Sequence, residues 1–463
     1  MKILFVNARN DDEHTSHSRN GMYVPLGILS VITYARSKLG DRLEDIAVID
    51  EDVSELNASI FKNYDLVGFY ATTFNYLRTA AYAKQAKESG AKTVLGGPHG
   101  TVLTKQVLTN KPSFDFVIRE EGEIPFEQLL RHLLGDDVKL NSIPSLGFRD
   151  SNGKVVISSV THINDLATIP IISREYVPMG RYVENYHKLY GDRADLVQGS
   201  IFSSKGCNWR DVTDGGCVFC ARLEIGMRFR PIPQIWEEIR GLKEMYGVNS
   251  IWDISDDNLN SPEWFKAFVD ARPTDLNDVS FFIYSRVGTV KKDLVPYFKK
   301  LNVEEIFVGA ESGDNTVLKR SFKGQTVSTI RRATKLLREN DIRFFPSFIL
   351  GLPGENIQSL ENTYELCKEI ADQGGANRLG VTILQPIPGC SAYNQTVENS
   401  RENGVNLDDL DEIQMPYYER AWAKNFTDVD YDTLGEYKEK IDAVVGKTMK
   451  VFGGRTEKTK KLT

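Results

Sequence analysis

The sequence predicts an α/β protein: a doubly wound parallel sheet, then a parallel (β/α)6 partial barrel, then a helical C-terminal region. Short apolar runs alternate with helical patterns over residues 1–135, and this alternation resumes over residues 196–393. Residues 394–463 have a mainly helical pattern, and the irregular residues 136–195 connect the two α/β parts. Strand–helix alternation is typical of parallel sheets, because parallel neighbours need a crossover connection.

In the first part, five short apolar runs are the expected strands: residues 2–6, 46–49, 66–70, 93–95 and 114–118. A doubly wound sheet binds its ligands at the carboxyl ends of its strands. The residues expected at that edge, and therefore as candidate ligand contacts, are Thr72, Thr73, Gly97, His99 and Glu121.

In the second part, six runs are the expected strands: residues 196–203, 250–254, 279–284, 305–308, 343–350 and 379–384. Six βα units in succession predict a partial or full parallel barrel, whose chemistry lies at the C-terminal ends of its strands. The connecting segment contains an expected hairpin that turns at residues 151–153. The helical C-terminal region is expected to cover the barrel mouth.

Composition narrows the functional classes. The 463 residues are 41% hydrophobic and 26% charged, which is ordinary for a globular protein, and no apolar run is long enough for a membrane span. The formal net charge of −7 argues against a nucleic-acid partner. The N-terminus reads as a strand and not as a secretory signal. Five cysteines, an odd and sparse set, do not form a disulfide framework, so we expect a reducing, cytoplasmic location.

Three of these cysteines, Cys207, Cys217 and Cys220, fall within fourteen residues on a glycine-rich loop after the first barrel strand. Three thiolates can hold three irons of a [4Fe–4S] cluster and leave the fourth iron open. That iron can chelate S-adenosylmethionine (SAM), and an electron from the cluster can then break a sulfur–carbon bond. A zinc site stays open as an alternative, with Cys367 or Cys390 as a fourth ligand. Three inert, buried cysteines are a weaker alternative, because the loop is polar.

Further motifs follow in order along the chain: PLGILSVITYAR, LGGPHGT, REEGEIPFEQLL, GAESGDNTVLKRSFKG, FILGLPGE and LQPIPGCSAY. With the cysteine loop, they resemble the radical SAM superfamily, and specifically its class with an N-terminal cobalamin-binding domain. The resemblance covers residues 1 to about 394. It implies a cobalamin-type sheet, a radical SAM barrel, and three cofactors: a [4Fe–4S] cluster, SAM and cobalamin.

The resemblance also implies roles by position. Phe219 would pack near the adenine of SAM, and Arg286 and Glu311 would lie near its polar groups. Gly351 to Gly354 would let the backbone approach the nucleoside. For Arg286 and Glu311 the alternative is an ordinary salt bridge at the barrel rim.

Two aspartates after the second barrel strand have two possible roles. Asp256 and Asp257 would contact SAM or cap the next helix. The resemblance names no catalytic proton or hydrogen donor.

The chain departs from the family pattern in two places. Nine residues separate Cys207 from Cys217, where most of the superfamily has three; this spacing resembles that of the catalytic subunit of the elongator tRNA-modifying complex. Many cobalamin domains have an Asp-x-His-x-x-Gly loop after the first strand. Here residues 12–17 read DEHTSH, so ligation of cobalt by His14 stays open.

The resemblance implies a cobalamin-dependent methyltransferase that acts on an unactivated carbon or a similar centre of an unidentified substrate. A radical SAM enzyme without methyl transfer, performing a cyclisation, rearrangement or oxidation, is an alternative; a zinc-binding sensor without enzymatic activity is another. Methylthiotransfer is unlikely, because the N-terminal part has no cysteine. The cluster also implies an electron donor such as a flavodoxin or ferredoxin.

Overall fold

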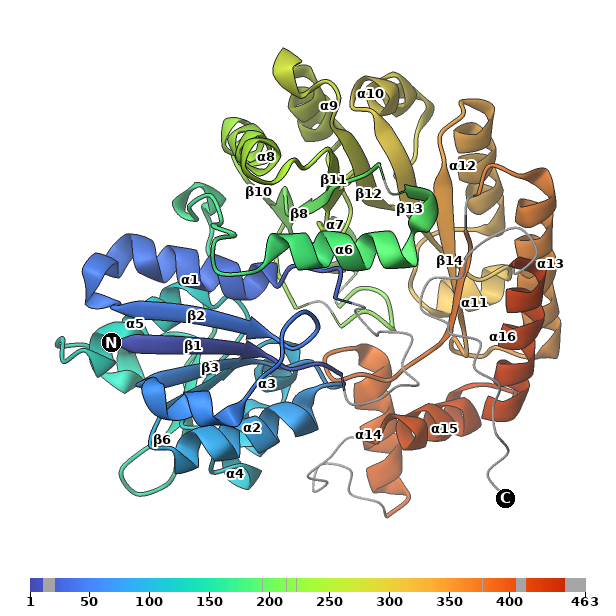
Figure 1. The fold of residues 1–463 in the computed structure, drawn as a ribbon. Coiled ribbons are helices and arrows are strands. Elements are labelled where there is room, and N and C mark those ends of the chain that lie inside the picture. Colours follow the sequence, from blue (N-terminus) through green and yellow to red (C-terminus); the bar gives the residue numbers. More distant parts are fainter. Residues whose placement is uncertain are drawn as a thin grey trace.

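The computed structural model describes residues 1–10, 21–193, 195–213, 215–221, 223–376, 378–404 and 414–445. Two α/β parts lie side by side, and helices of the C-terminal region lie along the barrel (Figure 1). His14 and the basic C-terminal tail lie outside the described residues. None of the described helices is long and apolar enough to cross a membrane.

The N-terminal sheet has seven strands in the order β2-β1-β3-β4-β5-β6-β7. The first five along the chain pair in parallel, which confirms the expected doubly wound part. They are β1 Lys2–Asn7, β2 Asp45–Asp50, β3 Leu66–Tyr70, β4 Lys92–Gly96 and β5 Phe116–Ile118. The predicted hairpin forms β6 Leu146–Arg149 and β7 Val155–Ile157, which extend the sheet with antiparallel pairing.

Helices cover both faces of this sheet because successive strand residues point to opposite sides. On one face, Ile3 and Phe5 pack with helices α1 Leu26–Leu39 and α5 Glu123–Leu133. On the other face, Leu4 and Val6 pack with α2 Tyr76–Glu88 and α4 Thr104–Asn110. The arrows of β1 to β3 point toward the barrel (Figure 1), so the carboxyl edge of the sheet faces the second part.

The barrel sheet has six parallel strands in the order β15-β14-β13-β12-β11-β8. Its first and last strands do not pair with each other, so the barrel is partial. The strands are β8 Gln198–Ile201, β11 Ser250–Asp253, β12 Ser280–Arg286, β13 Val303–Glu311, β14 Phe344–Leu350 and β15 Gly380–Ile383. The helices packed on it are α8 Ile232–Tyr246, α9 Pro262–Asp270, α10 Val295–Lys300, α12 Val327–Glu339 and α13 Ile357–Gln373.

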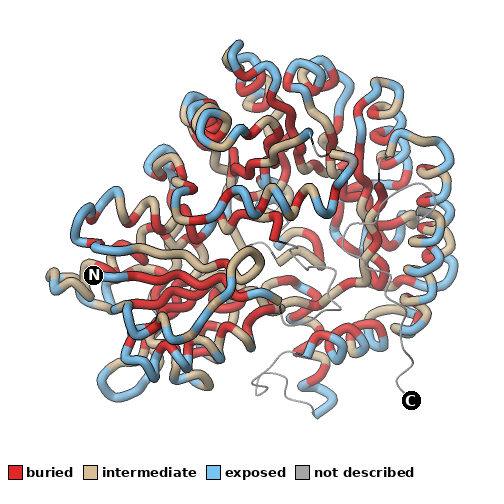
Figure 2. Tube along the Cα trace, viewed as in Figure 1, coloured by how far each residue is buried: buried red, intermediate tan, exposed pale blue. Residues whose placement is uncertain are grey.

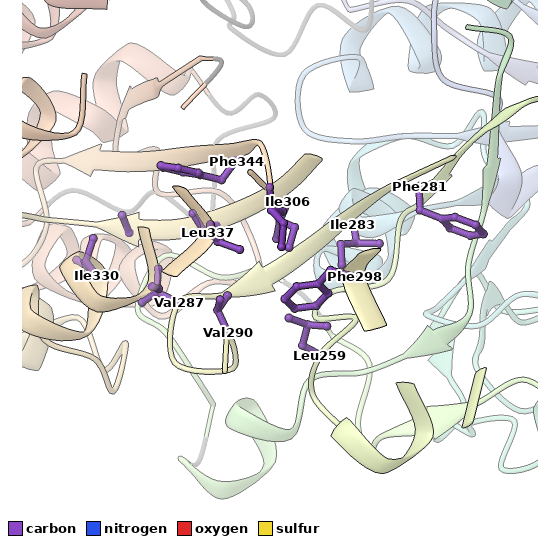
Figure 3. Close-up of a cluster of buried hydrophobic side chains, with 14 of the residues drawn as sticks. Leu259, Phe281, Ile283, Val287, Val290, Phe298, Ile306, Ile330, Leu337 and Phe344 are labelled. Atoms are coloured by element: carbon purple, nitrogen blue, oxygen red, sulfur yellow. The ribbon is translucent and has the colours of Figure 1, made fainter. Parts of the chain in front are cut away.

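Successive residues of each barrel strand point to opposite faces of the sheet, either outward to the helices or inward to the barrel lumen. Phe281, Ile283 and Ile306 point outward and pack with Phe298 and Leu337 of the helices (Figure 3). The strands of both sheets are mostly buried (Figure 2). Residues with the opposite parity point into the lumen, where an aromatic cluster gathers: Trp252, Phe282, Tyr284, Phe307 and Phe345, with Tyr23 from the N-terminal part.

The connecting segment forms a packed layer. Its helix α6 Met179–Leu189 runs between the two parts (Figure 1), and Met179 and Tyr182 pack with Leu29 of α1 and Phe202 after β8. Below it, Glu238 of α8 lies 2.6 Å from Arg174 and 2.5 Å from Arg230, all three buried. A buried carboxylate between two guanidinium groups is a well-compensated charge, so it fixes the segment against the barrel.

The C-terminal region has three described helices: α14 Ser391–Glu402, α15 Met415–Phe426 and α16 Tyr431–Val445. Tyr418 and Trp422 of α15 are buried against Leu352, which follows β14, and against Val218 of the cysteine loop. The α15 helix therefore lies at the end of the barrel that carries the cysteines.

Candidate cofactor sites

A short ribbon closes the base of the cysteine loop. β9 Ser204–Lys205 pairs antiparallel with β10 Arg228–Phe229. Gly206 has φ +88°, and a Cβ atom there would collide with the carbonyl of Gly226. Only glycine allows this approach. The loop therefore leaves and rejoins the barrel at nearly one point, and residues Asn208–Val212 form helix α7 within it.

Two backbone hydrogen bonds hold the Cys217–Cys220 turn in place. The amide of Val218 donates to Ser321 at 3.2 Å, and the carbonyl of Val218 accepts from Ala392 at 3.0 Å. The Sγ atom of Cys217 lies 3.8 Å from the carbonyl oxygen of Phe322. The turn is therefore fixed between the segment after β13 and the start of α14.

Two thiols of this loop, those of Cys207 and Cys217, are in an environment that opposes their ionisation. Burial raises the pKa of Cys217 to about 11, against the lowering effect of the Lys323 charge. Burial also raises the pKa of Cys207. Thiolates are the form that binds metal, so loading of the site must release protons.

The zinc alternative finds no support in the ligand geometry. Among the residues that the structure describes, no three side chains of His, Cys, Asp or Glu gather as the ligands of one metal ion would. Zinc ligands surround a single ion, whereas the cysteines of a cluster bind different irons. Cys367 packs in the outer core between α13 and the sheet, so its position is unsuitable for a fourth ligand.

Beside Cys217, a buried ion pair lies at the carboxyl end of β13. The Nζ atom of Lys323 is 2.6 Å from Oε1 of Glu311, and Glu311 has a left-handed backbone with φ +68°. A Cβ atom on Gly309 would lie 2.8 Å from that Nζ, so this glycine leaves room for the pair. Burial alone lowers the pKa of Lys323, but Glu311 and Cys217 raise it, and the net shift is upward.

Arg286 and Phe219 complete this group. The guanidinium of Arg286 stacks 4.2 Å from the ring centre of Trp209 and donates to the carbonyl of Lys323. The Nζ atom of Lys323 lies 5.6 Å from the centre of the Phe219 ring. The salt bridge foreseen as an alternative for Glu311 thus exists, with Lys323 as partner. The sequence did not single out Lys323 or Trp209, although Lys323 lies in a quoted motif and Trp209 lies in the cysteine loop.

Hydrogen bonds to helix α15 and to Glu355 hold the Gly351–Gly354 turn in place. Both glycines have left-handed backbones, with φ +81° and +72°. The carbonyl of Gly351 accepts from Nε1 of Trp422 at 2.7 Å, and the amide of Gly354 donates to Phe426 at 2.7 Å. The Gly351 amide donates to the carboxyl group of Glu355, whose pKa burial raises to about 8.

The aspartates after β11 do not cap the next helix. Helix α9 is capped by Ser261, whose Oγ accepts from the amide of Trp264. Asp257 is buried and accepts from Leu259 at 3.1 Å, and burial raises its pKa to about 6. Asp256 lines the cavity described next.

A cavity of about 350 Å³ joins the carboxyl edge of the N-terminal sheet to the cysteine loop. Gly97 and Glu121, two of the five residues expected at that edge, line it. Its walls come from the sheet and α1 on one side and from the loop on the other, including Gly27, Ile28, Gly68, Gly96, Val94, Phe126, Lys205, Gly206 and Ala221. The volume lies in the range of ligand pockets, and a lining of glycines and apolar side chains with several charged groups, among them Glu121 and Lys205, fits a cofactor that both parts contact.

The other three residues expected at that edge do not line the cavity. His99 stacks on Tyr76 with ring centres 3.8 Å apart, and burial lowers its pKa to about 3. Its Nδ1 lies 3.3 Å from Oγ1 of Thr73, and the Thr72 amide donates to Asn75 at 2.8 Å. These side chains therefore fix the turn after β3.

An ion cluster spans the two parts beside this cavity. Glu121 lies 2.7 Å from Nη1 of Arg228 and 3.4 Å from Nζ of Lys205. Lys205 also lies 3.6 Å from Glu123, which accepts from Ser30 at 2.6 Å. Two cations from the ribbon thus meet two carboxylates from the N-terminal part, which fixes the cysteine loop relative to the sheet edge.

Comparisons with known proteins agree with this geometry. A model of the radical SAM superfamily matches residues 201–367, and a model of the B12-binding domain matches residues 16–130. An uncharacterized methyltransferase of Pyrococcus horikoshii is 28% identical over 390 residues, which cover 81% of this chain and 79% of that protein. The anaerobic magnesium-protoporphyrin IX monomethyl ester cyclase of Rubrivivax gelatinosus is 26% identical, over 66% of this chain and only 54% of the cyclase.

Among solved structures, the radical SAM methyltransferase TsrM of Kitasatospora setae, with cobalamin and a [4Fe–4S] cluster bound, has a TM-score of 0.74 at 14% identity. The match covers 100% of this chain and 92% of that one, and at this identity it shows the fold. With both family models in the expected order, the chain belongs to the radical SAM superfamily and carries a B12-binding domain before the radical SAM domain.

Proposed function

We propose that this cobalamin-dependent radical SAM enzyme is a methyltransferase that acts on an unactivated carbon or a similar centre. The observation that carries the proposal is the cavity shared by the sheet edge, at Gly97, and the cysteine loop, at Gly206 and Ala221. Methyl transfer through cobalamin needs both cofactor domains to face one space. Holding reactants together in this way removes most of the entropic cost of their encounter.

The residues of the barrel side fit the cluster and SAM. Cys207, Cys217 and Cys220 would hold the cluster, which leaves one iron for the methionine end of SAM. Phe219 offers a ring for the adenine, and the Gly351–Gly354 turn offers a close backbone approach. Glu311, which pairs with Lys323, would accept hydrogen bonds from a polar group of SAM.

The residues of the sheet side fit cobalamin. Gly97 and the neighbouring glycines leave space along the strand ends, and Glu121 ties this edge to the cysteine loop through Arg228. When bound, cobalamin supplies a methyl carrier. The chain's own contribution is to exclude water from the cavity and to fix the distance between the two domains.

Relatives named as methyltransferases and as cyclases leave a second candidate, a radical reaction without methyl transfer. The products formed from SAM separate the two. The test is anaerobic reconstitution with iron, sulfide and hydroxocobalamin, incubation with SAM and dithionite as the reductant, and quantification of S-adenosylhomocysteine and 5′-deoxyadenosine. Formation of S-adenosylhomocysteine only when cobalamin is present supports methyl transfer. 5′-Deoxyadenosine alone, unaffected by cobalamin, favours the cyclase-like candidate.

A further inference from the structure

Helix α7 lies within the nine residues that separate Cys207 from Cys217, and it carries Trp209. Nε1 of Trp209 donates to the carbonyl of Phe322 at 2.7 Å. The same carbonyl oxygen lies 3.8 Å from Sγ of Cys217. The long loop therefore folds so that its tryptophan lies beside a candidate cluster ligand.

Gly324 makes room for the indole ring of Trp209. Its backbone is left-handed, with φ +66°, and a Cβ atom there would lie 2.1 Å from both Cζ2 and Cη2 of the ring. Contacts that short do not occur, so only glycine lets the ring approach the backbone this closely. The Phe322 carbonyl and Gly324 together determine where the ring lies.

The ring of Trp209 is the surface against which Arg286 stacks. The Cζ atom of Arg286 lies 4.2 Å from the ring centre, and Nη2 donates to the carbonyl of Lys323. A cation over the face of an indole is attracted by the negative face of the ring. The stack and the hydrogen bond together hold the guanidinium plane of Arg286 in one orientation.

Arg286 lacks an acceptor for part of its guanidinium. Its Nε atom is buried and has no hydrogen-bond partner in the described part of the chain. Lys323, the neighbouring cation, pairs with Glu311, whereas no described carboxylate lies within ion-pair distance of Arg286. A buried donor without an acceptor is costly, and the shape of a guanidinium matches that of a carboxylate. This arrangement favours a ligand that brings an anionic group to Arg286.

We propose that Trp209 is a positioning residue for SAM: it holds Arg286 in the orientation that receives the carboxylate of SAM. The inference rests on the proposed function, because it needs SAM bound at the cluster. The carboxylate is the negatively charged group of SAM, so it supplies the acceptor that Arg286 lacks among the described residues. Trp209 acts through Arg286, and the added length of the cysteine loop serves to bring it there.

The test measures equilibrium binding of SAM and of decarboxylated SAM to the reconstituted full-length protein, with iron content checked in every variant. Decarboxylated SAM lacks only the carboxylate, so its affinity is insensitive to a residue that acts through that group. Trp209→Leu keeps apolar bulk without a π face, whereas Trp209→Phe keeps a smaller π face. Gly324→Ala displaces the indole while Trp209 and Arg286 are both retained. Gly247→Ala is its matched control, because Gly247 has a similar backbone, with φ +70°, and open space around it.

We expect Trp209→Leu and Gly324→Ala to weaken SAM binding about tenfold and to leave the affinity for decarboxylated SAM unchanged. Trp209→Phe should recover most of the loss, and Gly247→Ala should match wild type. If Trp209→Leu loses iron, Gly324→Ala decides. Equal losses for the two ligands, or variants that bind SAM as wild type does, overturn the positioning role alone. A wild-type protein that holds iron but binds no SAM overturns both this inference and the proposed function.

Discussion

The sheet edge lines the shared cavity with glycines, apolar side chains and carboxylates such as Glu121. On the barrel side, the thiols, a buried ion pair and a stacked guanidinium lie outside the residues that line this cavity. The carboxylates of the sheet side, Glu121 and Glu123, already pair with Lys205 and Arg228. On the cysteine side, burial raises the pKa values of Cys207 and Cys217 and favours their protonated form, so metal binding there must release protons. The difference indicates that the shape of the pocket controls cofactor binding at the sheet edge, whereas metal binding at the cysteines depends on the release of protons.

The largest expected effect is on the cysteine side. Replacing Cys207, Cys217 or Cys220 with alanine should abolish cluster binding and SAM cleavage, because each thiolate holds one iron. Iron analysis and electron paramagnetic resonance after anaerobic reconstitution measure the loss. Cys367→Ala is the control and should keep the cluster, since this thiol lies in the outer core. A cluster that survives loss of Cys217 would contradict the assignment.

Loss of the carboxylate at position 311 should have the next largest effect. In the proposed site, Glu311→Ala would remove a charge-assisted hydrogen bond to SAM and would leave Lys323 without its partner, so SAM should bind roughly ten- to a hundredfold more weakly. Equilibrium binding of SAM to the clustered protein measures this. Glu361→Ala removes a similar ion pair, 2.8 Å from Lys440 on the surface, and should leave the affinity unchanged. Equal affinities for Glu311→Ala and wild type would exclude Glu311 from the SAM site.

On the sheet side, a single methyl group should suffice to weaken cobalamin binding. Gly97 has φ +93°, and a Cβ atom there would lie 2.6 Å from the Ala71 carbonyl, so Gly97→Ala must displace the edge of the cavity. We expect about a tenfold loss of affinity in an absorbance titration with hydroxocobalamin. Gly90 has nearly the same backbone, with φ +92°, but open space around it. If Gly90→Ala causes the same loss, backbone strain and not cavity shape is responsible.

The smallest effect concerns the pH dependence of stability. The pKa of Glu355 is raised in the folded state to about 8, above its ordinary value of 4.5. Between these values the folded protein binds more protons than the unfolded one, so its stability should fall as pH rises from about 4.5 to 8. Glu355→Gln removes this contribution and should flatten the fall in Tm by about 3 °C or more. Parallel pH profiles for the two proteins would contradict the raised pKa.

Local patterns in the sequence were sufficient to predict where the parallel strands lie. The apolar runs located all the parallel strands of both sheets. Glycines and cysteines located the loop after β8. Each of these patterns extends over only a few consecutive residues, so the local sequence alone reveals it.

Long-range pairings were not accessible in the same way. Nothing in the local pattern shows that Glu311 pairs with Lys323, that Trp422 holds Gly351, or that the predicted hairpin extends the N-terminal sheet. His99 illustrates the same limit, because its place at a strand end suggested a ligand contact. The structure instead buries it against Tyr76, a contact that depends on the packing of α2.

The closed base of the cysteine loop has a consequence for how such loops change length. Since Gly206 and Gly226 bring the two ends of the loop together, the number of residues between Cys207 and Cys217 does not set the position of either end. The loop can therefore gain or lose residues near Val212 while the ribbon and the Cys217–Cys220 turn stay in place. This makes α7 a natural point of insertion, where evolution or an engineer can add a recognition segment without rebuilding the barrel.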